Sequence, residues 1–388
     1  MLIFVPMIHT REFKKVDFMN KIFPIALIAL LGIIGNSCIR NKSNYRISGV
    51  DNPSYLANTE FQLFEDLTSP KFGHLIKKYR LDTVVRGESD EFKRMLLLRH
   101  WIKSVIRIED HSDHYSGDGY AEGILDAALK GEGFHCAHFM RVQNAVMNAF
   151  GYVTRVIGAG PGVKGGPDGN HGIDEIWSNK YCKWFLSDAK YNHHFEKNGI
   201  PLSALEVRDE YIKNKAADIV LVKGKDRIPI EFDSEFEFSK KRFAQTYTWI
   251  KWYIYGNRHT IYPNKYNGSI MVYEDDFFKN NIYYRDGKPV PKEAFDSWRH
   301  IKDRKVFEWT PNVLNVVAKV NGQTLNVHIS SETPNFKEYQ MKENINGQWR
   351  KIDNNLSLEL SKEGHAYFFR SVNLANVAGP EYKVVVIK

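Results

Sequence analysis

The chain has 388 residues, a formal net charge of +8 and three cysteines. Its basic residues are spread along the sequence and mixed with acidic ones, which argues against a nucleic-acid-binding protein. The net positive charge is explained by a need for solubility. Three cysteines are too few for a disulfide scaffold, and the length exceeds what one hydrophobic core usually serves, so at least two domains are expected.

The first 38 residues are typical of a targeting segment. An apolar run from Ile22 to Ile34 follows Lys21 and ends at Gly35-Asn36-Ser37-Cys38. The run is shorter than the ~20 residues that a membrane-spanning helix needs. Small residues before a cysteine resemble a bacterial lipobox, in the relaxed form seen in Bacteroidetes because Gly35 replaces the common Leu.

This resemblance implies cleavage before Cys38 and a lipid on its thiol. The mature protein would have a net charge of +6, because residues 1–38 contain four basic and two acidic residues. The alternatives are an ordinary cleaved signal peptide and an uncleaved anchor.

Helices are predicted between Asn52 and Arg107, most strongly over Met95–Ile106, where apolar and basic residues recur at helical spacing. A short helix is predicted over 124–129. A further amphipathic helix begins at Cys136 and ends at Gly151, because the apolar residues between them repeat at three- and four-residue steps.

Strands are predicted over Tyr152–Ile157, His171–Trp177 and Tyr181–Asp188, with a glycine-rich loop from Gly158 to Gly169 after the first of them. The order from Cys136 onward is therefore helix, strand, strand, strand. A helix over Ser239–Tyr255 is also predicted, and its aromatic residues are interpreted as core rather than as a sugar-binding surface.

From Thr310 onward the pattern changes to short alternating strands, predicted over 325–329, 336–341, 349–352, 356–360, 365–372 and 382–387. This predicts a C-terminal β-sandwich. The run Tyr367–Asn373 resembles the last hairpin of a fibronectin type III domain. We therefore expect a signal peptide over 1–38, a catalytic or binding domain over 39–310, and a fibronectin type III or immunoglobulin-like domain over 311–388.

Cys136 begins a helix, where unpaired N–H groups and the helix dipole stabilise a thiolate. His171 starts the strand that follows and can take the thiol proton. Asp188 ends the next strand and can orient the imidazole and stabilise its charge. These three residues form a candidate catalytic triad.

With these residues in place, the sequence resembles the transglutaminase-like branch of the papain-like cysteine superfamily. The stretch Gly131–Cys136, the helix after it and the strand with Arg155 are similar to that family's cysteine motif. His171 with Glu175, and Trp184 with Asp188, are similar to its histidine and aspartate strands. The resemblance covers about Met95 to Lys197.

The resemblance implies an α+β fold with a papain-like core, in which a helix bearing the cysteine packs on an antiparallel sheet bearing the histidine and aspartate. It also implies acyl transfer on amides, with no cofactor and no metal. Two positions depart from the family. Ile173 replaces a frequent tryptophan, and Ala137-His138 replaces an acidic residue after the cysteine, so substrate positioning is open.

Other reactive residues have simpler interpretations. Cys182 alternates with apolar residues on a predicted strand, which favours a core cysteine, and a Cys136–Cys182 disulfide is the alternative. Five polar residues, some of them adjacent, suggest a metal site, but it is not favoured because no zinc-type cysteine spacing accompanies them. Those residues are His111, Asp113, His114, His193 and His194.

The expected function is an exported thiol hydrolase or acyltransferase that cleaves an amide in a peptide, a peptidoglycan stem or a modified glycan. Hydrolysis is favoured over cross-linking, because nothing in the sequence shows how water would be excluded. The expected location is the cell envelope, with a lipid anchor at Cys38 and no nucleic-acid partner. The alternative is a catalytically idle, lipid-anchored protein that binds a glycan or a protein.

Overall fold

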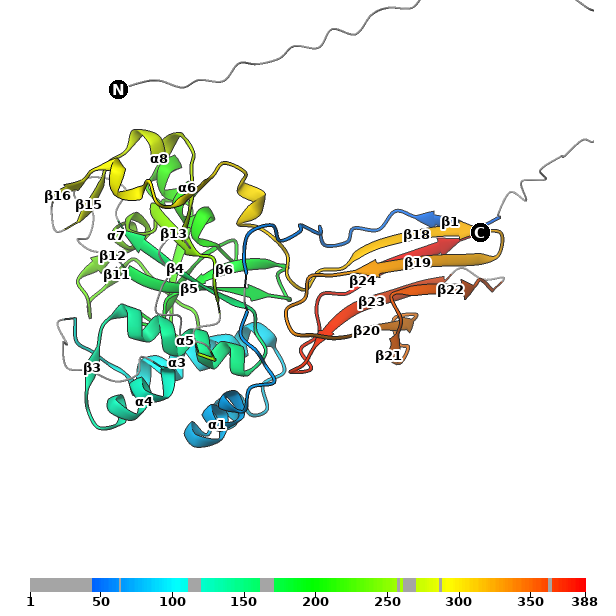
Figure 1. The fold of residues 1–388 in the computed structure, drawn as a ribbon, viewed down its shortest axis with the longest axis horizontal. Helices are drawn as coiled ribbons and strands as arrows, with labels where there is room; N and C mark the ends of the chain where they lie inside the picture. The colour runs from blue at the N-terminus through cyan, green and yellow to red at the C-terminus, as the bar shows by residue number, and fades with distance from the viewer. Residues whose placement is uncertain are drawn as a thin grey trace, which may run out of the picture. The chain divides into compact units, whose positions relative to one another are not determined.

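The computed structural model describes residues 44–62, 64–110, 120–160, 171–256, 259–260, 270–285, 288–361 and 365–388. Cys38 and the rest of the predicted signal peptide lie outside these residues. The described residues belong to one compact unit, Ser43–Lys388, which mixes helices and sheets as expected (Figure 1).

A helical layer forms the first part of this unit. It consists of α1 (Pro70–Tyr79), α2 (Leu81–Val84), α3 (Glu91–Val105), α4 (Ala121–Leu129) and α5 (Cys136–Ala149). The predictions of α3, α4 and α5 are confirmed. The helical prediction begins at Asn52 and was wrong for its described residues before Pro70, which contain no helix. Strand β1 (Arg46–Ser48) precedes that range.

The central sheet runs in the order β17-β14-β13-β4-β5-β6. Its strands are antiparallel except for β14 and β17, which are parallel. Their bounds are β4 (Thr154–Gly160), β5 (His171–Ser178), β6 (Lys183–Ser187), β13 (Trp249–Tyr253), β14 (Ile270–Tyr273) and β17 (Arg299–Ile301). The three strands predicted after α5 are confirmed as β4, β5 and β6, although β4 extends to Gly160, which the prediction placed in a loop.

Each face of this sheet has its own hydrophobic core. Apolar residues of α3, α4 and α5 pack with Ile176 and Phe185 on one face. On the other face, Ile173 and Trp177 pack with α6 (Ala204–Asn214) and α7 (Lys240–Thr246). In Figure 1 these two sets of helices lie on opposite sides of β4, β5 and β6. The sheet therefore separates the helix that begins at Cys136 from α6 and α7.

The helix predicted over Ser239–Tyr255 was wrong in its second half. Only Lys240–Thr246 is helical, and Trp249–Tyr253 forms β13, paired with β4 and β14. β-branched and aromatic residues favour strands, and a short apolar run cannot be assigned by spacing alone. The interpretation of the aromatic residues as core is confirmed for Trp249 and Trp252, which are 5% and 0% exposed.

Smaller sheets surround the central one. One runs in the order β10-β9-β7-β8, and three strand pairs are β2 with β3, β11 with β12 and β15 with β16. The bounds are β2 (Arg107–Ile108), β3 (Gly133–Phe134), β7 (His193–Lys197), β8 (Ile200–Pro201), β9 (Val220–Lys223), β10 (Ile228–Ile230), β11 (Phe232–Asp233), β12 (Phe238–Ser239), β15 (Tyr283–Arg285) and β16 (Lys288–Val290). The remaining helix is α8 (Asp276–Asn280), and 3-10 turns cover Lys292–Phe295 and Arg304–Val306.

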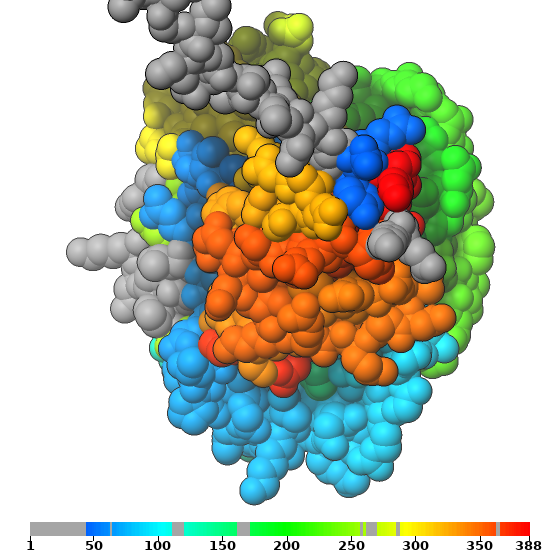
Figure 2. Space-filling view, turned by 90° about the vertical axis from the view of Figure 1, so that its right-hand side faces the viewer, coloured from blue at the N-terminus to red at the C-terminus, as the bar shows by residue number. Residues whose placement is uncertain are grey.

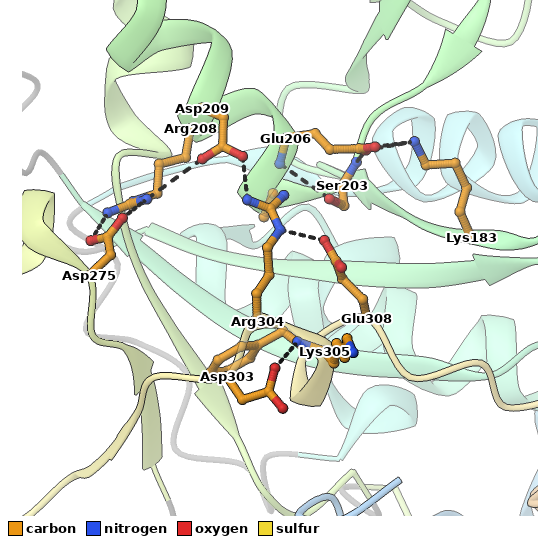
Figure 3. Close-up of polar contacts among 12 residues, drawn as sticks. Lys183, Ser203, Glu206, Arg208, Asp209, Asp275, Asp303, Arg304, Lys305 and Glu308 are labelled. Carbon is orange, nitrogen blue, oxygen red and sulfur yellow. Dashed lines mark hydrogen bonds and ion pairs between the residues drawn. The ribbon is translucent and has the colours of Figure 1, made fainter. Parts of the chain in front are cut away.

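Helix α6 is fixed to its neighbours at its N-terminus and along one side. Ser203 and Glu206 form a capping box, which satisfies otherwise unpaired N–H groups. Figure 3 shows the ion pairs around the helix, which are Lys183–Glu206, Arg304–Asp209, Arg304–Glu308 and Arg208–Asp275. They connect α6 to β6, to the start of α8 and to the segment that leads into the C-terminal strands.

The C-terminal strands form two sheets around a shared core. One sheet runs β1-β24-β23-β20-β21 and the other β18-β19-β22. Their apolar residues pack together, including Leu325 and Val327 from one sheet and Phe369 and Val384 from the other. The bounds are β18 (Asn315–Asn321), β19 (Thr324–Ser330), β20 (Phe336–Glu343), β21 (Arg350–Ile352), β22 (Asn355–Glu359), β23 (His365–Asn373) and β24 (Tyr382–Ile387).

Each of the six strands predicted in this region overlaps an observed strand, but β18 and β1 were missed. β1 comes from the start of the described chain and pairs antiparallel with β24, with Ile47 opposite Val386. In Figure 2 the blue atoms of this early segment lie beside the red atoms of the last strand.

Candidate active site

The Cys136 thiol lies at the first residue of α5. The residue before it, His135, is the N-cap, and its Nδ1 accepts a hydrogen bond of 3.3 Å from the Ala137 amide. Strand β5 passes close to this helix start because it has glycine at position 172. A Cβ there would lie 3.1 Å from the Met140 sulfur and 3.4 Å from the Cα of Ala137. The absence of that side chain brings the start of β5 up to the thiol.

The surroundings of Cys136 favour its thiolate. Burial alone raises the pKa of the thiol, but hydrogen bonds from His135 and His171, the charge on His171 and the Gly172 amide outweigh burial and lower the pKa to about 5. A free thiol titrates at ~8.5. At neutral pH the sulfur is therefore ionised, which is the reactive form.

The His171 imidazole links the thiol to a carboxylate. Its Nε2 lies 2.5 Å from Oδ2 of Asp188, which leaves Nδ1 as the ring nitrogen for Cys136. Burial lowers the pKa of His171, but the charge of Asp188 and the hydrogen bonds to Asp188 and Cys136 raise it to about 9. Between these two pKa values Cys136 and His171 form a thiolate–imidazolium pair.

Asp188 is fully buried and receives hydrogen bonds on both oxygens. The Tyr247 hydroxyl donates to Oδ2 over 2.8 Å, in addition to His171, and the Tyr191 amide donates to Oδ1 over 3.1 Å. Burial acts to raise the pKa of this carboxyl, but the charge and hydrogen bond of His171, together with the Tyr191 amide, hold the pKa well below its usual range. Asp188 is therefore ionised and fixed in orientation.

Tyr247 continues the network away from the reacting atoms. Its oxygen lies 3.0 Å from Nε2 of His193, and because the hydroxyl proton goes to Asp188, His193 donates to the tyrosine oxygen. Burial lowers the pKa of His193 to about 3, so this imidazole is neutral. The structure brings the predicted residues Cys136, His171 and Asp188 together. The sequence predictions did not include Tyr247, Tyr191 or His135.

Replacing Tyr247 with phenylalanine is expected to lower the free energy of unfolding by ~1.5–3 kcal/mol, the usual contribution of a hydrogen bond to a buried charged group. Urea denaturation of the wild type and Tyr247→Phe measures this difference. The matched control is Tyr211→Phe, because the Tyr211 ring is also buried but its hydroxyl has no hydrogen bond among the described residues. Equal losses in the two variants would contradict a specific role for the Tyr247 hydroxyl.

Cys182 is the other described cysteine, and both it and Cys136 are free, so the alternative of a disulfide between them is wrong. Cys182 precedes β6 instead of lying on it and has a φ of 52°. It packs partly buried against the core, as expected. Burial, followed by the charge of Glu91, raises its thiol pKa to about 11. Cys182 is therefore protonated at neutral pH.

Of the residues considered for a metal site, His111, Asp113 and His114 lie outside the described residues. His193 and His194 are fully buried, and the second is hydrogen-bonded to Glu196 at 2.8 Å. Within the described ranges no group of three or more His, Cys, Asp or Glu side chains is arranged to hold a metal ion. In the same ranges no helix is long and apolar enough to cross a membrane.

No family model and no curated protein matches this sequence. Among solved structures, the chain is similar to a protein from Cytophaga hutchinsonii described as a "putative cysteine protease". The sequence identity is 13% and the TM-score 0.25, over 42% of this chain and 50% of that one. The assignment of the site therefore rests on the geometry around Cys136, His171 and Asp188.

Proposed function

We propose that this chain is a cysteine hydrolase or acyltransferase that acts on amide bonds, with Cys136, His171 and Asp188 as its catalytic triad. The observation that carries the proposal is the connected order of groups. The Cys136 thiol at a helix N-terminus is hydrogen-bonded to the His171 imidazole, and that imidazole is hydrogen-bonded to the buried carboxylate of Asp188. This combination activates a nucleophile and supplies a proton donor for the leaving group.

In the first step the Cys136 thiolate attacks the amide carbonyl, and a C–S bond forms while the carbonyl oxygen becomes negative. The backbone N–H of Cys136, at the positive end of the α5 dipole, can stabilise this oxygen. His171 then gives its Nδ1 proton to the leaving amine as the C–N bond breaks, which leaves a thioester on Cys136 and a neutral imidazole.

In the second step neutral His171 takes a proton from water, and the hydroxide oxygen attacks the thioester. The C–S bond breaks, the acid product leaves and the thiolate–imidazolium pair is restored. Asp188 stays ionised and orients the imidazole in both steps. An amine in place of water would give acyl transfer, and hydrolysis is the favoured outcome.

The proposal extends to the fold and its divisions. A papain-like core of the transglutaminase-like kind is supported by the packing of α5 on the antiparallel strands that carry His171 and Asp188. A fibronectin type III or immunoglobulin-like domain over 311–388 is supported by two sheets that share one core. The remaining divisions are 1–38 as signal peptide and 39–310 as the catalytic domain.

The location and substrate class are proposed from sequence. The apolar run before Cys38 supports export and a lipid anchor in the cell envelope. Substrates there include peptides, peptidoglycan stems and modified glycans, each of which offers an amide bond.

The test is to incubate the full-length protein with peptide amides that release a fluorescent amine, and to search for a thioester on Cys136 by mass spectrometry. Cys136→Ser is expected to lower the rate of amine release by at least about 10³-fold. Cys182→Ser is expected to keep the wild-type rate. Equal rates in the wild type and in Cys136→Ser, with no adduct at residue 136, would reject the enzyme and favour a binding protein.

A further inference from the structure

Three aromatic side chains form a surface beside the imidazole of His171, and we call Tyr191, Phe236 and Phe238 the aromatic shelf. The Tyr191 ring lies 5.1 Å from the His171 ring, and Phe236 packs edge-on against Tyr191 at 4.6 Å. The Phe238 ring lies 6.4 Å from the Tyr191 ring. All three rings are only partly buried, so part of each faces solvent close to the proposed reaction.

The shelf is assembled from separate parts of the chain. Tyr191 lies in the short connection between β6 and β7, closed by hydrogen bonds between the backbones of Asp188 and His193. Phe236 and Phe238 come from the β11–β12 hairpin, which runs directly into α7 (Figure 1). The shelf therefore joins the turn that holds the catalytic carboxylate to a segment outside the triad.

Every ring of the shelf has a cation against its face. Lys190 lies 5.1 Å from the centre of Tyr191, and Arg242 of α7 lies 3.9 Å from that of Phe238. Lys223 and Lys103 lie 5.2 and 5.8 Å from that of Phe236. Cations at these distances are attracted by the negative ring faces, so each ring of the shelf has a positively charged side chain beside it.

The four cations differ in their partners. Lys190 is paired with Asp110 at 2.5 Å, Lys103 with Glu235 at 2.8 Å and Lys223 with Asp233 at 2.7 Å. Arg242 is exposed and has no carboxylate within ion-pair distance among the residues that the structure describes. A guanidinium stacked on a ring keeps its N–H edge free, in a fork that fits a carboxylate.

Arg242 lies within electrostatic reach of the site. The charges of Cys136 and Arg242 both act on the Tyr191 hydroxyl. Burial and the charges of Asp188, Asp110 and Cys136 raise the pKa of Tyr191, whereas the charge of Arg242 lowers it. A substrate whose amide sits at Cys136 can thus extend over Tyr191 and Phe238 to the Arg242 guanidinium.

We propose that the aromatic shelf is a subsite for a carboxylate, bound by Arg242, so that this enzyme prefers amide substrates with an acidic group near the cleaved bond. The inference rests on the proposed function and specifies its substrate class. The acidic group is either a side-chain carboxylate or a free chain terminus.

The first experiment needs no substrate. Cys136 is alkylated at pH 7 with iodoacetate, which is an anion, and with iodoacetamide, which is neutral and of similar size. The ratio of the two rates at Cys136 is measured by mass spectrometry in the wild type, Arg242→Gln and Arg242→Lys. Dividing by the iodoacetamide rate removes changes in thiol reactivity and isolates the attraction of the anion.

The ratio is expected to fall about twofold to fivefold in Arg242→Gln at low ionic strength and to stay near the wild-type value in Arg242→Lys, which keeps the charge. The difference between the wild type and Arg242→Gln should shrink in about 0.5 M salt. Lys241→Gln is the matched control, because Lys241 is the exposed neighbour of Arg242 and has no ring or carboxylate contact in the described part of the chain.

A second experiment identifies the carboxylate. Peptide amides with glutamate or glutamine beside the cleaved bond, each with a free or an amidated terminus, are compared by kcat/KM. Arg242→Gln is expected to lower kcat/KM about tenfold for the peptides that carry the recognised carboxylate, and to leave the fully amidated glutamine peptide unchanged.

The outcomes separate the two proposals. If Cys136 reacts rapidly but the alkylation ratio is the same in the wild type and Arg242→Gln, the carboxylate subsite is wrong and the catalytic proposal stands. If Cys136 reacts slowly with both reagents in every variant, the catalytic proposal fails and the inference fails with it.

Discussion

Iodoacetamide is expected to label Cys136 with a pH midpoint near 5 in the wild type, and His171→Ala is expected to move that midpoint to the ~8.5 of a free thiol or above. The lowered pKa of about 5 depends on His135 and His171, while burial acts in the opposite direction. Removing the imidazole takes away its hydrogen bond and its positive charge and leaves the burial, which opposes the remaining hydrogen bond from His135. At pH 7 the labelling rate should then fall by about 30-fold or more.

Labelling rates from pH 4 to 10, resolved by residue with mass spectrometry, measure this change. Cys182 is an internal control, because its pKa of about 11 keeps it protonated and slow at neutral pH in both proteins. Amide cleavage should rise as pH passes about 5, where the thiolate forms, and fall as pH passes about 9, where His171 loses the proton for the leaving amine. A Cys136 midpoint that does not respond to His171→Ala would contradict the ion pair.

Arg155→Met is expected to lower the free energy of unfolding by ~3–5 kcal/mol, the cost of leaving one charge of a buried pair without its partner. Arg155 and Glu175 are 3% and 1% exposed and lie opposite each other on β4 and β5. The Arg155 Nε donates to Glu175 over 2.9 Å, and Nη2 donates to the Phe307 carbonyl over 2.6 Å. The guanidinium also lies 4.1 Å from the Trp184 ring, so packing is lost as well.

Urea or thermal denaturation of the full-length chain measures this loss. Arg86→Met is the control, because Arg86 pairs with Asp82 on the surface and such a pair contributes only ~0–1 kcal/mol. Combining Arg155→Met with Glu175→Gln should cost less than the sum of the single changes, because the carboxylate left without its partner is then removed. A loss of less than about 1 kcal/mol in Arg155→Met would contradict this expectation. It would mean that the hydrogen bonds from the Trp252 indole and the Ala204 amide are enough to stabilise the buried Glu175 carboxylate.

The sequence predicted elements best where one physical pattern decides the structure. Helix α5 was found with its start because one apolar face repeats between Cys136 and Gly151, and the structure has a φ of 79° at that glycine. β13 was misassigned because WIKWY is apolar at most positions, so its spacing carries no period. Its conformation is decided by pairing with β4 and β14, which are distant in sequence.

The site followed the same rule. Cys136, His171 and Asp188 lie within 53 positions and at the ends of recognisable elements. Tyr247, whose hydroxyl holds Asp188, is 59 residues further on and sits in a segment whose conformation was misjudged. The role of Tyr191 could have been predicted from the sequence, because the backbone amide three positions after an aspartate that ends a strand can donate a hydrogen bond to its carboxylate. Within the aromatic shelf the pairs Lys190–Tyr191 and Arg242–Phe238 are local in sequence. The contact of Tyr191 with Phe236 and Phe238 depends on tertiary packing.

The pairing of β1 with β24 has a consequence for how the chain is made. The first described strand is synthesised long before its partner, and the neighbouring contact between Asn52 and Lys383 spans 331 residues. Closing so long a loop costs little more than closing a shorter one, but it must wait until β24 has been synthesised. Until then the edge of β1 has no partner, so a ribosome-bound or prematurely terminated chain exposes that edge to chaperones and proteases.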